Sequence, residues 1–263
     1  MMGCRERKAR EASQRRKKKE ERRMACGTPA PVMKEGEKMK PIYQPKGAAA
    51  EYGELALNIY TGCPHRCFYC FAPRVLHKDK EVFHSTVEPR KNIVEETRKQ
   101  LERENITGKL IHLCFTCDPY PTGYDSAVTR EIIKLLKAHG NHVQILTKGD
   151  GSRDFDLLDE NDWYGITLDG EEDRKGTLQS LFDAKKKGIR TWVSFEPVLY
   201  DMYVNWTIEI FHDYFDKVKI GKLNYHQSNI DWKPFGLYVE SLCKKYGLDY
   251  YIKDSLRAEM EKG

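Results

Sequence analysis

Two rhythms of apolar and polar positions alternate along this chain. Short, mostly apolar runs predict strands at 55–61, 109–116, 142–148, 163–169, 189–197 and 217–224, with a short seventh at 248–254. Between them, apolar residues recur every three or four positions, which is typical of amphipathic helices. These segments predict helices at 88–105, 126–140, 174–188, 204–215 and 234–247, and a short one at 153–160.

Strands that alternate with helices in this way are joined by right-handed crossovers and form a parallel sheet. Six or seven such units without dinucleotide-type glycines favour a barrel, full or partial, over a doubly wound sheet. We therefore predict an α/β fold, a partial (β/α)6-type TIM barrel, over residues 41–263. Its chemistry should lie at the C-terminal ends of the strands. These ends read YTGC, FTCDPY, LTKGD, TLDGEE, SFEP and KLNYH.

Basic charge is concentrated at the N-terminus. Residues 1–23 contain eleven Lys and Arg and four Glu, a net charge of +7. Because the whole chain carries +5, the remainder carries −2. We predict a disordered basic tail and lead-in over residues 1–40, either a solvated arm or an arm that attracts nucleic acid.

The chain has no apolar run near the roughly 20 residues that span a bilayer. Its charged N-terminus is unlike a secretory signal, so we expect a cytoplasmic protein with no membrane partner. In that compartment the eight cysteines should be mostly reduced. A cluster of them is then typical of a metal or catalytic site rather than of disulfides.

Three cysteines, Cys63, Cys67 and Cys70, crowd into the segment NIYTGCPHRCFYCFAPRV at 58–75. As thiolates they can ligate a soft metal. A structural zinc site needs a fourth ligand. The local histidines, none at ordinary finger spacing, are His65, His77 and His84. An iron–sulfur cluster normally takes four cysteines, and one held by three keeps an iron open to a non-protein ligand, as a catalytic cluster requires.

C-x3-C-x2-C just after the first strand of a βα barrel, with an aromatic before the third cysteine, resembles the signature of the radical S-adenosylmethionine (SAM) superfamily. The resemblance extends from about residue 40 to residue 254. The run QPKGAAAEYGELALNIYTGCPHRCFYC, followed by CDPY, LTKG and SFEP, is similar to the branch that contains spore photoproduct lyase and lyase-like proteins. The fold implied is the partial barrel of the radical SAM kind.

The resemblance implies a [4Fe-4S] cluster on Cys63, Cys67 and Cys70, whose open iron binds SAM. One electron then cleaves SAM to methionine and a 5′-deoxyadenosyl radical, which abstracts hydrogen from the substrate. A reductant protein such as flavodoxin or ferredoxin is the implied electron donor. By the same resemblance Tyr69 borders the adenine, and the alternative for this ring is core packing.

Residues at the other strand ends receive roles by the same resemblance. Thr116 and Asp118 match the place where the superfamily binds the amino group of SAM. Lys148 and Thr167 match positions near its carboxylate and ribose, and Glu196 lies where later strands border the SAM pocket. Each residue alone is also an ordinary loop residue, and Asp118 opens a DPYP turn.

Two departures from the lyase pattern concern hydrogen return. Phe71 stands where the lyase has a tyrosine, and Phe115 aligns with its hydrogen-donor cysteine. Residues two apart on a strand share a face, so Cys117 points as residue 115 would, while Cys114 points the other way. We take Cys117 as the candidate catalytic substitute; the alternative is a small apolar filler.

Three functions remain in view. The first is a radical SAM enzyme that acts on a nucleic-acid base of DNA or RNA, as a repair lyase or a base-modifying enzyme. The second keeps the chemistry but takes a peptide or small metabolite. The third is a zinc-bound nucleic-acid-binding protein without catalysis. Fold and cofactor do not determine the substrate.

Overall fold

The computed structural model describes residues 40–171 and 175–262 of the chain. The predicted basic tail and lead-in, as far as residue 39, lie outside the described residues. Within the described part, the predicted α/β class and the alternation of strands with helices are confirmed. No helix in that part has both the length and the apolar character that crossing a membrane demands.

One sheet of eight strands organises the fold. In spatial order its strands are β1 (Ile42–Tyr43), β2 (Leu55–Leu57), β5 (Leu110–Leu113), β6 (His142–Thr147), β7 (Trp163–Thr167), β8 (Arg190–Val198), β9 (Lys217–Lys222) and β10 (Asp249–Ile252). β1 runs antiparallel to β2, and the other neighbouring pairs are parallel. From β2 onward, neighbours in the sheet follow one another along the chain, as in the predicted barrel.

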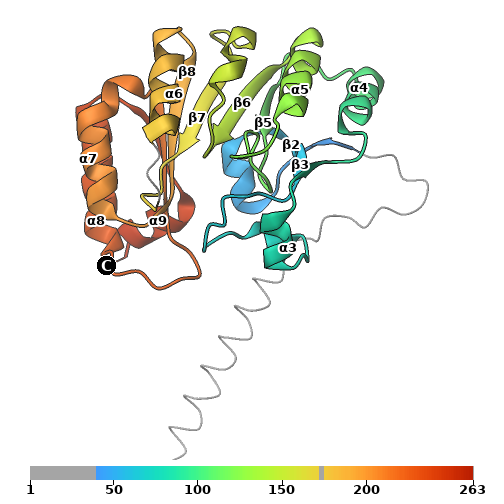
Figure 1. The fold of residues 1–263 in the computed structure, drawn as a ribbon. Coiled ribbons are helices and arrows are strands. Elements are labelled where there is room, and N and C mark those ends of the chain that lie inside the picture. The colour runs from blue at the N-terminus through green and yellow to red at the C-terminus, as the bar shows by residue number, and fades with distance from the viewer. Residues whose placement is uncertain (1–39, 172–174, 263) are drawn as a thin grey trace, which may run out of the picture.

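Helices connect these strands along the outer side of the sheet (Figure 1). They are α4 (Ile93–Glu104), α5 (Ala127–Ala138), η2 (Ser152–Leu157), α6 (Lys175–Lys186), α7 (Asp201–Phe211), η3 (His212–Tyr214) and α8 (Trp232–Lys245), with α9 (Asp254–Met260) after the last strand. Because each crossover is right-handed and joins adjacent strands, the linking helices share one face. The opposite face is left for η1 (Gly47–Tyr52).

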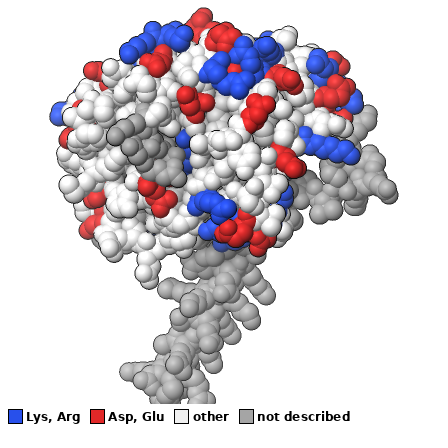
Figure 2. Space-filling model, viewed as in Figure 1, with Lys and Arg blue, Asp and Glu red and all other residues white. Residues whose placement is uncertain are grey.

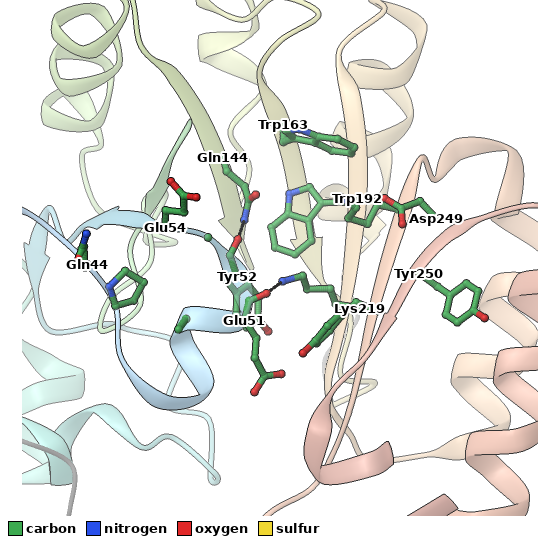
Figure 3. Close-up of a pocket in the computed structure, with 15 residues that line it drawn as sticks. Gln44, Glu51, Tyr52, Glu54, Gln144, Trp163, Trp192, Lys219, Asp249 and Tyr250 are labelled. Carbon is green, nitrogen blue, oxygen red and sulfur yellow. Dashed lines mark hydrogen bonds and ion pairs between the residues drawn. The ribbon is translucent and has the colours of Figure 1, made fainter. Parts of the chain in front are cut away.

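The hydrophobic core lies between the sheet and its helices. Side chains on a strand alternate between the two faces, and Ile145, Ile166, Val193 and Val218 on the helix side have no exposed area. The face toward η1 has a different character, because Gln144, Trp192 and Lys219 point to it (Figure 3). The aliphatic packing that fills a TIM barrel is therefore replaced here by polar and aromatic side chains.

The sheet curls around η1. The Lys219 ammonium donates to the carbonyl oxygen of Glu51, and the Gln144 amide donates to the carbonyl oxygen of Tyr52 at 3.0 Å. Beyond β10, the Lys253 ammonium donates to the carbonyl oxygen of Ala48 at 3.2 Å. One short helix thus contacts strands from the middle and the far edge of the sheet. No ladder joins the edge strands β1 and β10 within the described residues, so the sheet is curved and open.

The segment around Pro89 corrects one prediction. The sequence placed Pro89 in the first turn of a helix at 88–105. The structure instead places it in β4 (Glu88–Pro89), which pairs with β3 (Tyr60–Thr61), and α4 begins at Ile93. Pairing with a distant strand keeps this segment extended, and Asn92 then enters the helix with a left-handed φ of 53°. Tertiary pairing has outweighed the local helix signal.

Other boundaries moved for similar reasons. The predicted strand at 55–61 is divided between β2 and β3, which belong to different sheets. The short helix expected at 153–160 is the 3-10 helix η2. Helices α2 (Ala72–Val75), α3 (Lys80–Ser85) and α9 were not predicted. The predicted seventh strand is confirmed as β10.

Gly165 on β7 provides a test of interior packing. A Cβ there would lie 2.1 Å from Nε1 of Trp192, which donates to the carbonyl oxygen of Ile145 at 2.9 Å and so cannot easily move. We expect Gly165→Ala to lower the free energy of unfolding by about 1–3 kcal/mol through overpacking. Urea unfolding measures this.

Gly176→Ala is the matched control, because a Cβ at this exposed helical glycine would meet nothing within 4 Å. Its free energy of unfolding should be unchanged or slightly higher. Equal stability of the two variants would contradict the packing of Trp192 against β7.

Candidate active site

The three predicted cluster cysteines share one loop, residues 62–71, here called the cysteine loop. It begins at Gly62, whose φ is 94° and whose Cβ, if present, would lie 2.0 Å from the carbonyl oxygen of Thr86. Only glycine fits so close to another backbone. The next amide, of Cys63, donates to the carbonyl oxygen of Phe83 at 3.2 Å and ties the loop to α3. The half-buried cysteines of the loop are Cys63, Cys67 and Cys70.

Lys148, which follows β6, joins the cysteine loop to the ends of two strands. Its ammonium lies 3.2 Å from the Cys67 sulfur and also donates to the hydroxyl of Tyr69. It pairs with the carboxylate of Asp169, just after β7, and that carboxylate also accepts from the Tyr69 hydroxyl. The structure therefore brings together Cys67, Tyr69 and Lys148, which were predicted from the sequence, and Asp169, which was not.

Asp118, which follows β5, is a buried carboxylate held by several donors. It accepts from the amide of Tyr120 at 2.8 Å, from the amide of Lys148 at 2.8 Å and from the hydroxyl of Thr147. The imidazole Nε2 of His65, on the cysteine loop, lies 3.0 Å from the same carboxylate. Burial raises the pKa of Asp118, but these partners outweigh it and lower the pKa below its ordinary value. Asp118 thus carries a charge that links the cysteine loop to β5 and β6.

Thr116 and Cys117 lie on the turn between β5 and Asp118. The Asn58 side-chain oxygen accepts from the Thr116 amide at 2.9 Å, and the Thr116 hydroxyl accepts from Arg90 at 3.3 Å. The sulfur of Cys117 accepts from the amide of Tyr60 at 3.4 Å. Both residues therefore face the backbone that leads into the cysteine loop.

Thr167 and Glu196 belong to the concave face of the sheet rather than to the Lys148 group. Thr167 is buried at the end of β7 and pairs in register with Ser194 of β8. Two residues farther along β8, the carboxylate of Glu196 accepts from the hydroxyl of Tyr52 and lies 3.0 Å from the ammonium of Lys253. Burial, with the adjacent Glu196 carboxylate, raises the pKa of Tyr52 well above its usual value. Tyr52 therefore stays a neutral donor.

Two of the cysteine thiols, those of Cys63 and Cys70, are protonated in the absence of a metal. Burial, assisted by the nearby Asp118 carboxylate, raises the pKa of Cys63. Burial likewise raises the pKa of Cys70. A metal that binds here must displace these protons, as thiolate ligation requires.

Sequence reasoning missed three residues that hold this region together. Asp169 stands two residues after Thr167 in the quoted strand end TLDGEE, where an aspartate before glycine is also an ordinary turn residue. His65 was considered only as a metal ligand, and its contact with Asp118 depends on the fold. Tyr52 lies in a stretch rich in Gly, Ala and Pro that resembles a linker, and no local pattern marks it as an interior residue.

A cavity of about 440 Å³ adjoins Lys148 at the C-terminal ends of the strands. Its volume is in the range of small-molecule pockets. The loop 120–124, the stretch 148–150 and the start of α6 line it. Half-exposed Tyr124 stands at its wall.

A second cavity, of about 830 Å³, opens at the opposite end of the sheet (Figure 3). Trp163, Lys217 and Asp249, the first residues of their strands, line it together with η1. Lys219 lies there with its ammonium 4.0 Å from the ring centre of Tyr52. Burial, and then the charge of Lys253, lowers the pKa of Lys219 to about 8. This cavity is remote from the cysteine loop along the strands.

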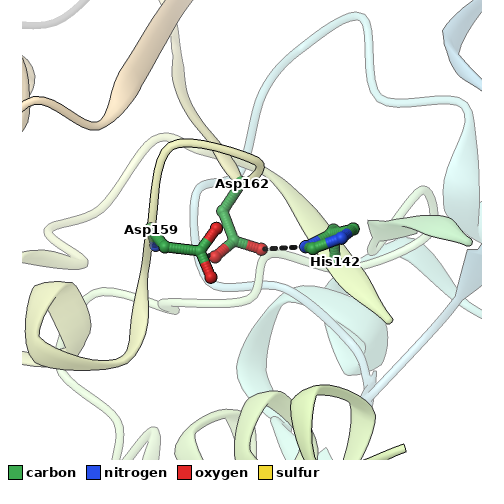
Figure 4. A group of neighbouring side chains, drawn as sticks. All are labelled: His142, Asp159 and Asp162. Atoms are coloured by element: carbon green, nitrogen blue, oxygen red, sulfur yellow. Dashed lines mark hydrogen bonds and ion pairs between the residues drawn. The ribbon is translucent and has the colours of Figure 1, made fainter. Parts of the chain in front are cut away.

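A group of oxygen and nitrogen ligands outside both cavities consists of His142, Asp159 and Asp162 (Figure 4). The ammonium of Lys137 already pairs with both carboxylates. Asp162 also accepts from the amide of Val143 at 2.8 Å. These side chains form an ion-paired anchor for the loop, in which the ammonium of Lys137 occupies the place that a metal ion would take.

Comparisons with known proteins show what this arrangement resembles. Over 111 residues the chain is 32% identical to the uncharacterized protein Rv2578c of Mycobacterium tuberculosis strain H37Rv and to the uncharacterized protein Mb2609c of Mycobacterium bovis. The match covers 40% of this chain and 32% of each relative, so the chain spans about a third of the length of these curated relatives. No solved structure matches it.

The family comparison extends farther along the chain. Residues 57–209 match the model of the radical SAM superfamily. This range includes the cysteine loop, the dense contacts around Lys148 and Asp118, and Glu196 on the concave face. The chain therefore belongs to the radical SAM superfamily.

Proposed function

We propose that this radical SAM enzyme holds a [4Fe-4S] cluster on Cys63, Cys67 and Cys70 and acts on a nucleic-acid base, as a repair lyase or a base-modifying enzyme. The observation that carries the proposal is that side chains from several strand ends converge on one loop. The loop that carries the three thiols is contacted by residues from the ends of β5, β6 and β7, through Cys67, Tyr69 and His65. A site of this kind at the C-terminal ends of parallel strands is where βα barrels place their chemistry.

The donor set fits the cluster that the superfamily implies. It supplies three soft thiolates and leaves one iron free of protein, the open position at which SAM binds. Among the described residues, the three sulfurs are not gathered within 4.8 Å of one another. Ligands of a single zinc ion would stand roughly 3.8 Å apart, from tetrahedral geometry and a Zn–S bond of about 2.3 Å. In a cluster each thiolate takes its own iron, so the sulfurs need not converge on one point.

When bound, the reduced cluster supplies the electron that converts SAM to methionine and a 5′-deoxyadenosyl radical. The chain's own residues position that chemistry. Lys148 presents an ammonium beside Cys67, where it can meet the SAM carboxylate. Tyr69, whose hydroxyl is held by Asp169, borders the adenine. We infer that Thr116, Thr167 and Glu196 border the remainder of SAM.

Asp118 is better suited to a positioning role than to direct contact with SAM. Its carboxylate already accepts from Tyr120, Thr147 and Lys148 and faces His65. It therefore fixes the backbone of Lys148 relative to the cysteine loop. Cys117, anchored on the amide of Tyr60, is the proposed donor that returns a hydrogen atom to the product.

Exposed aromatic side chains near the cysteine loop support a nucleic-acid base as substrate. Phe68, Phe71 and Tyr225, here called the aromatic rim, are 42%, 50% and 70% exposed. The ring of Phe68 lies 5.1 Å from His226, and the Arg74 guanidinium lies 5.4 Å above the ring of Tyr225. The loop after β9 thus contacts the cysteine loop. Exposed rings with an adjacent guanidinium are what an unstacked base binds.

Charge on the body of the protein is mixed rather than basic. Figure 2 shows Lys and Arg interspersed with Asp and Glu over the visible face. The concentrated positive charge belongs to residues 1–23, outside the described residues. We therefore assign attraction for phosphates to that segment and contact with bases to the aromatic rim. A peptide or metabolite substrate is the competing outcome.

The first prediction concerns the cluster. Cys63→Ala, Cys67→Ala and Cys70→Ala should each lose most bound iron and sulfide and the visible absorbance of the anaerobically purified protein, because each removes one ligand. Cys243→Ala, in a buried thiol of α8, is the control and should keep both. Full iron content in Cys67→Ala would rule out the assigned ligands. Zinc without iron in the parent would select the non-catalytic alternative.

The second prediction concerns SAM. Lys148→Met should weaken SAM binding about 10- to 100-fold, the equivalent of one lost charge-assisted hydrogen bond. The cluster spectrum should remain, since Lys148 is not a ligand. Anaerobic titration calorimetry measures the affinity. Lys134→Met, on the exposed face of α5, is the control and should bind as the parent does. Parental affinity in Lys148→Met would remove Lys148 from the SAM site.

The third prediction separates the substrate classes. The full-length protein should bind single-stranded DNA or RNA with micromolar affinity at low salt, and the affinity should fall steeply as salt rises. Deletion of residues 1–23 should remove most of the affinity and flatten the salt dependence. Fluorescence anisotropy at several salt concentrations measures both.

A substitution in the aromatic rim isolates stacking from charge. Tyr225→Ala should cost about 1–3 kcal/mol of binding free energy and leave the salt dependence unchanged. Tyr238→Ala, a 48% exposed tyrosine of α8 outside the rim, should have no effect. If no form binds nucleic acid at low salt, the peptide or metabolite substrate replaces this proposal.

A further inference from the structure

Two cysteines outside the cysteine loop share a four-residue turn, CFTC at 114–117, here called the dithiol turn. It leaves β5 through Cys114, whose φ of 71° is in the left-handed region that non-glycine residues seldom adopt. The amide of Cys114 donates to the carbonyl oxygen of Leu57 at 2.8 Å. The side-chain oxygen of Asn58 accepts from the amides of Phe115 and Thr116 at 2.8 and 2.9 Å. The turn is therefore bound closely to the segment after β2.

This segment also orders the two sulfurs. The Cys117 sulfur accepts from the amide of Tyr60 at 3.4 Å. The Cys114 thiol interacts with the preceding amide, of Ile59, and with the Cys117 thiol. Because β5 ends at Leu113, strand alternation does not apply here, and the prediction that Cys114 points away from Cys117 is wrong: the two thiols are neighbours. The i, i+3 spacing of the pair is that of dithiols that close as disulfides.

The two thiols differ in access and in acidity. Cys114 is 6% exposed, and burial, followed by its contact with Cys117, raises its pKa. Cys117 is only partly buried. Burial raises its pKa too, but the Cys114 contact, the Tyr60 amide and the charge of Arg90 outweigh burial and leave the pKa of Cys117 below its ordinary value. A partly exposed, more acidic thiol beside a buried partner is the arrangement of an attacking and a resolving cysteine.

We propose that Cys114 and Cys117 form a reversible disulfide on the intact enzyme. In the first step the Cys117 thiolate attacks a disulfide oxidant such as glutathione disulfide and releases one glutathione thiolate. The Cys114 thiol, losing its proton, then attacks the mixed disulfide and releases the second. Two protein thiols are oxidised and one glutathione disulfide is reduced to two glutathione thiols. Thiol reductants reverse the reaction.

This modification site is distinct from the cluster site and does not depend on the proposed substrate. The remaining described cysteines are the three of the cysteine loop and Cys243, which is buried in α8. The dithiol turn runs directly into Asp118, so a bond across it would fix the geometry of the buried carboxylate that faces His65. It would also remove the Cys117 thiol as a hydrogen donor.

The sequence makes the test direct. Trypsin cleavage after Lys109 and Arg130 yields peptide 110–130, which contains these two cysteines and no others. The anaerobic, cluster-loaded protein is equilibrated in buffers of graded reduced and oxidised glutathione, alkylated and mapped by mass spectrometry. We expect the peptide to change from doubly alkylated to two hydrogens lighter than its free dithiol form, in one transition. The visible absorbance of the cluster should persist through that transition.

Two variants assign the roles. Cys114→Ser should trap a stable glutathione adduct on Cys117, whereas Cys117→Ser should leave Cys114 free of adduct. Cys243→Ser, the control, should leave the transition of peptide 110–130 unchanged. If either turn variant fails to fold, the map of the parent protein still decides. Two alkylated cysteines at every glutathione ratio, or a stable adduct on Cys117 beside alkylated Cys114 in the parent, would overturn the proposal.

Discussion

The carboxylate of Asp118 is the constraint on which the catalytic end of this molecule depends. It is buried, and a buried charge is tolerated only where donors replace the water it has lost. Those donors come from its own turn and from β6 and the residue after it, and the imidazole of His65 on the cysteine loop lies against the same carboxylate. Loss of one hydrogen bond to such a charged group typically costs about 1.5–3 kcal/mol. One side chain therefore couples the position of the thiols to that of Lys148.

Buried charged and polar groups that depend on hydrogen-bond partners also occupy the concave face of the sheet. Barrel interiors usually hold aliphatic layers, but here the interior carries Tyr52, Glu196 and Lys253 in mutual contact. The apolar core lies on the helix side, so stability and site geometry are supplied by different faces of the same strands. Such polar networks are rigid only when each member finds a partner. η1 supplies those partners, which explains why a short segment before β2 lies in the middle of the fold.

How far the sequence could lead is clear from particular residues. The cysteines were found by their spacing and its resemblance to the superfamily signature, and Lys148 and Asp118 by the same resemblance at the ends of predicted parallel strands. Asp169 and Tyr52 were missed because their partners are distant in sequence and their local surroundings resemble a turn and a linker. Pro89 was misassigned because helix propensity is local, while its pairing with Tyr60 is not. A helix or strand is indicated by its own stretch of sequence, whereas a contact depends on two stretches that are far apart in the sequence.

The dithiol turn and the cysteine loop meet at the same backbone, and this proximity has a physical consequence. Asn58 and the amide of Tyr60 hold the turn, and the segment that contains them leads directly into Gly62 and Cys63. A change in the turn is therefore transmitted through a few covalent bonds and the Asp118–His65 contact rather than across the core. Packed elements shift between discrete arrangements rather than deforming continuously. A single bond between Cys114 and Cys117 would select one arrangement of the turn, and with it one placement of the carboxylate that orders the catalytic end.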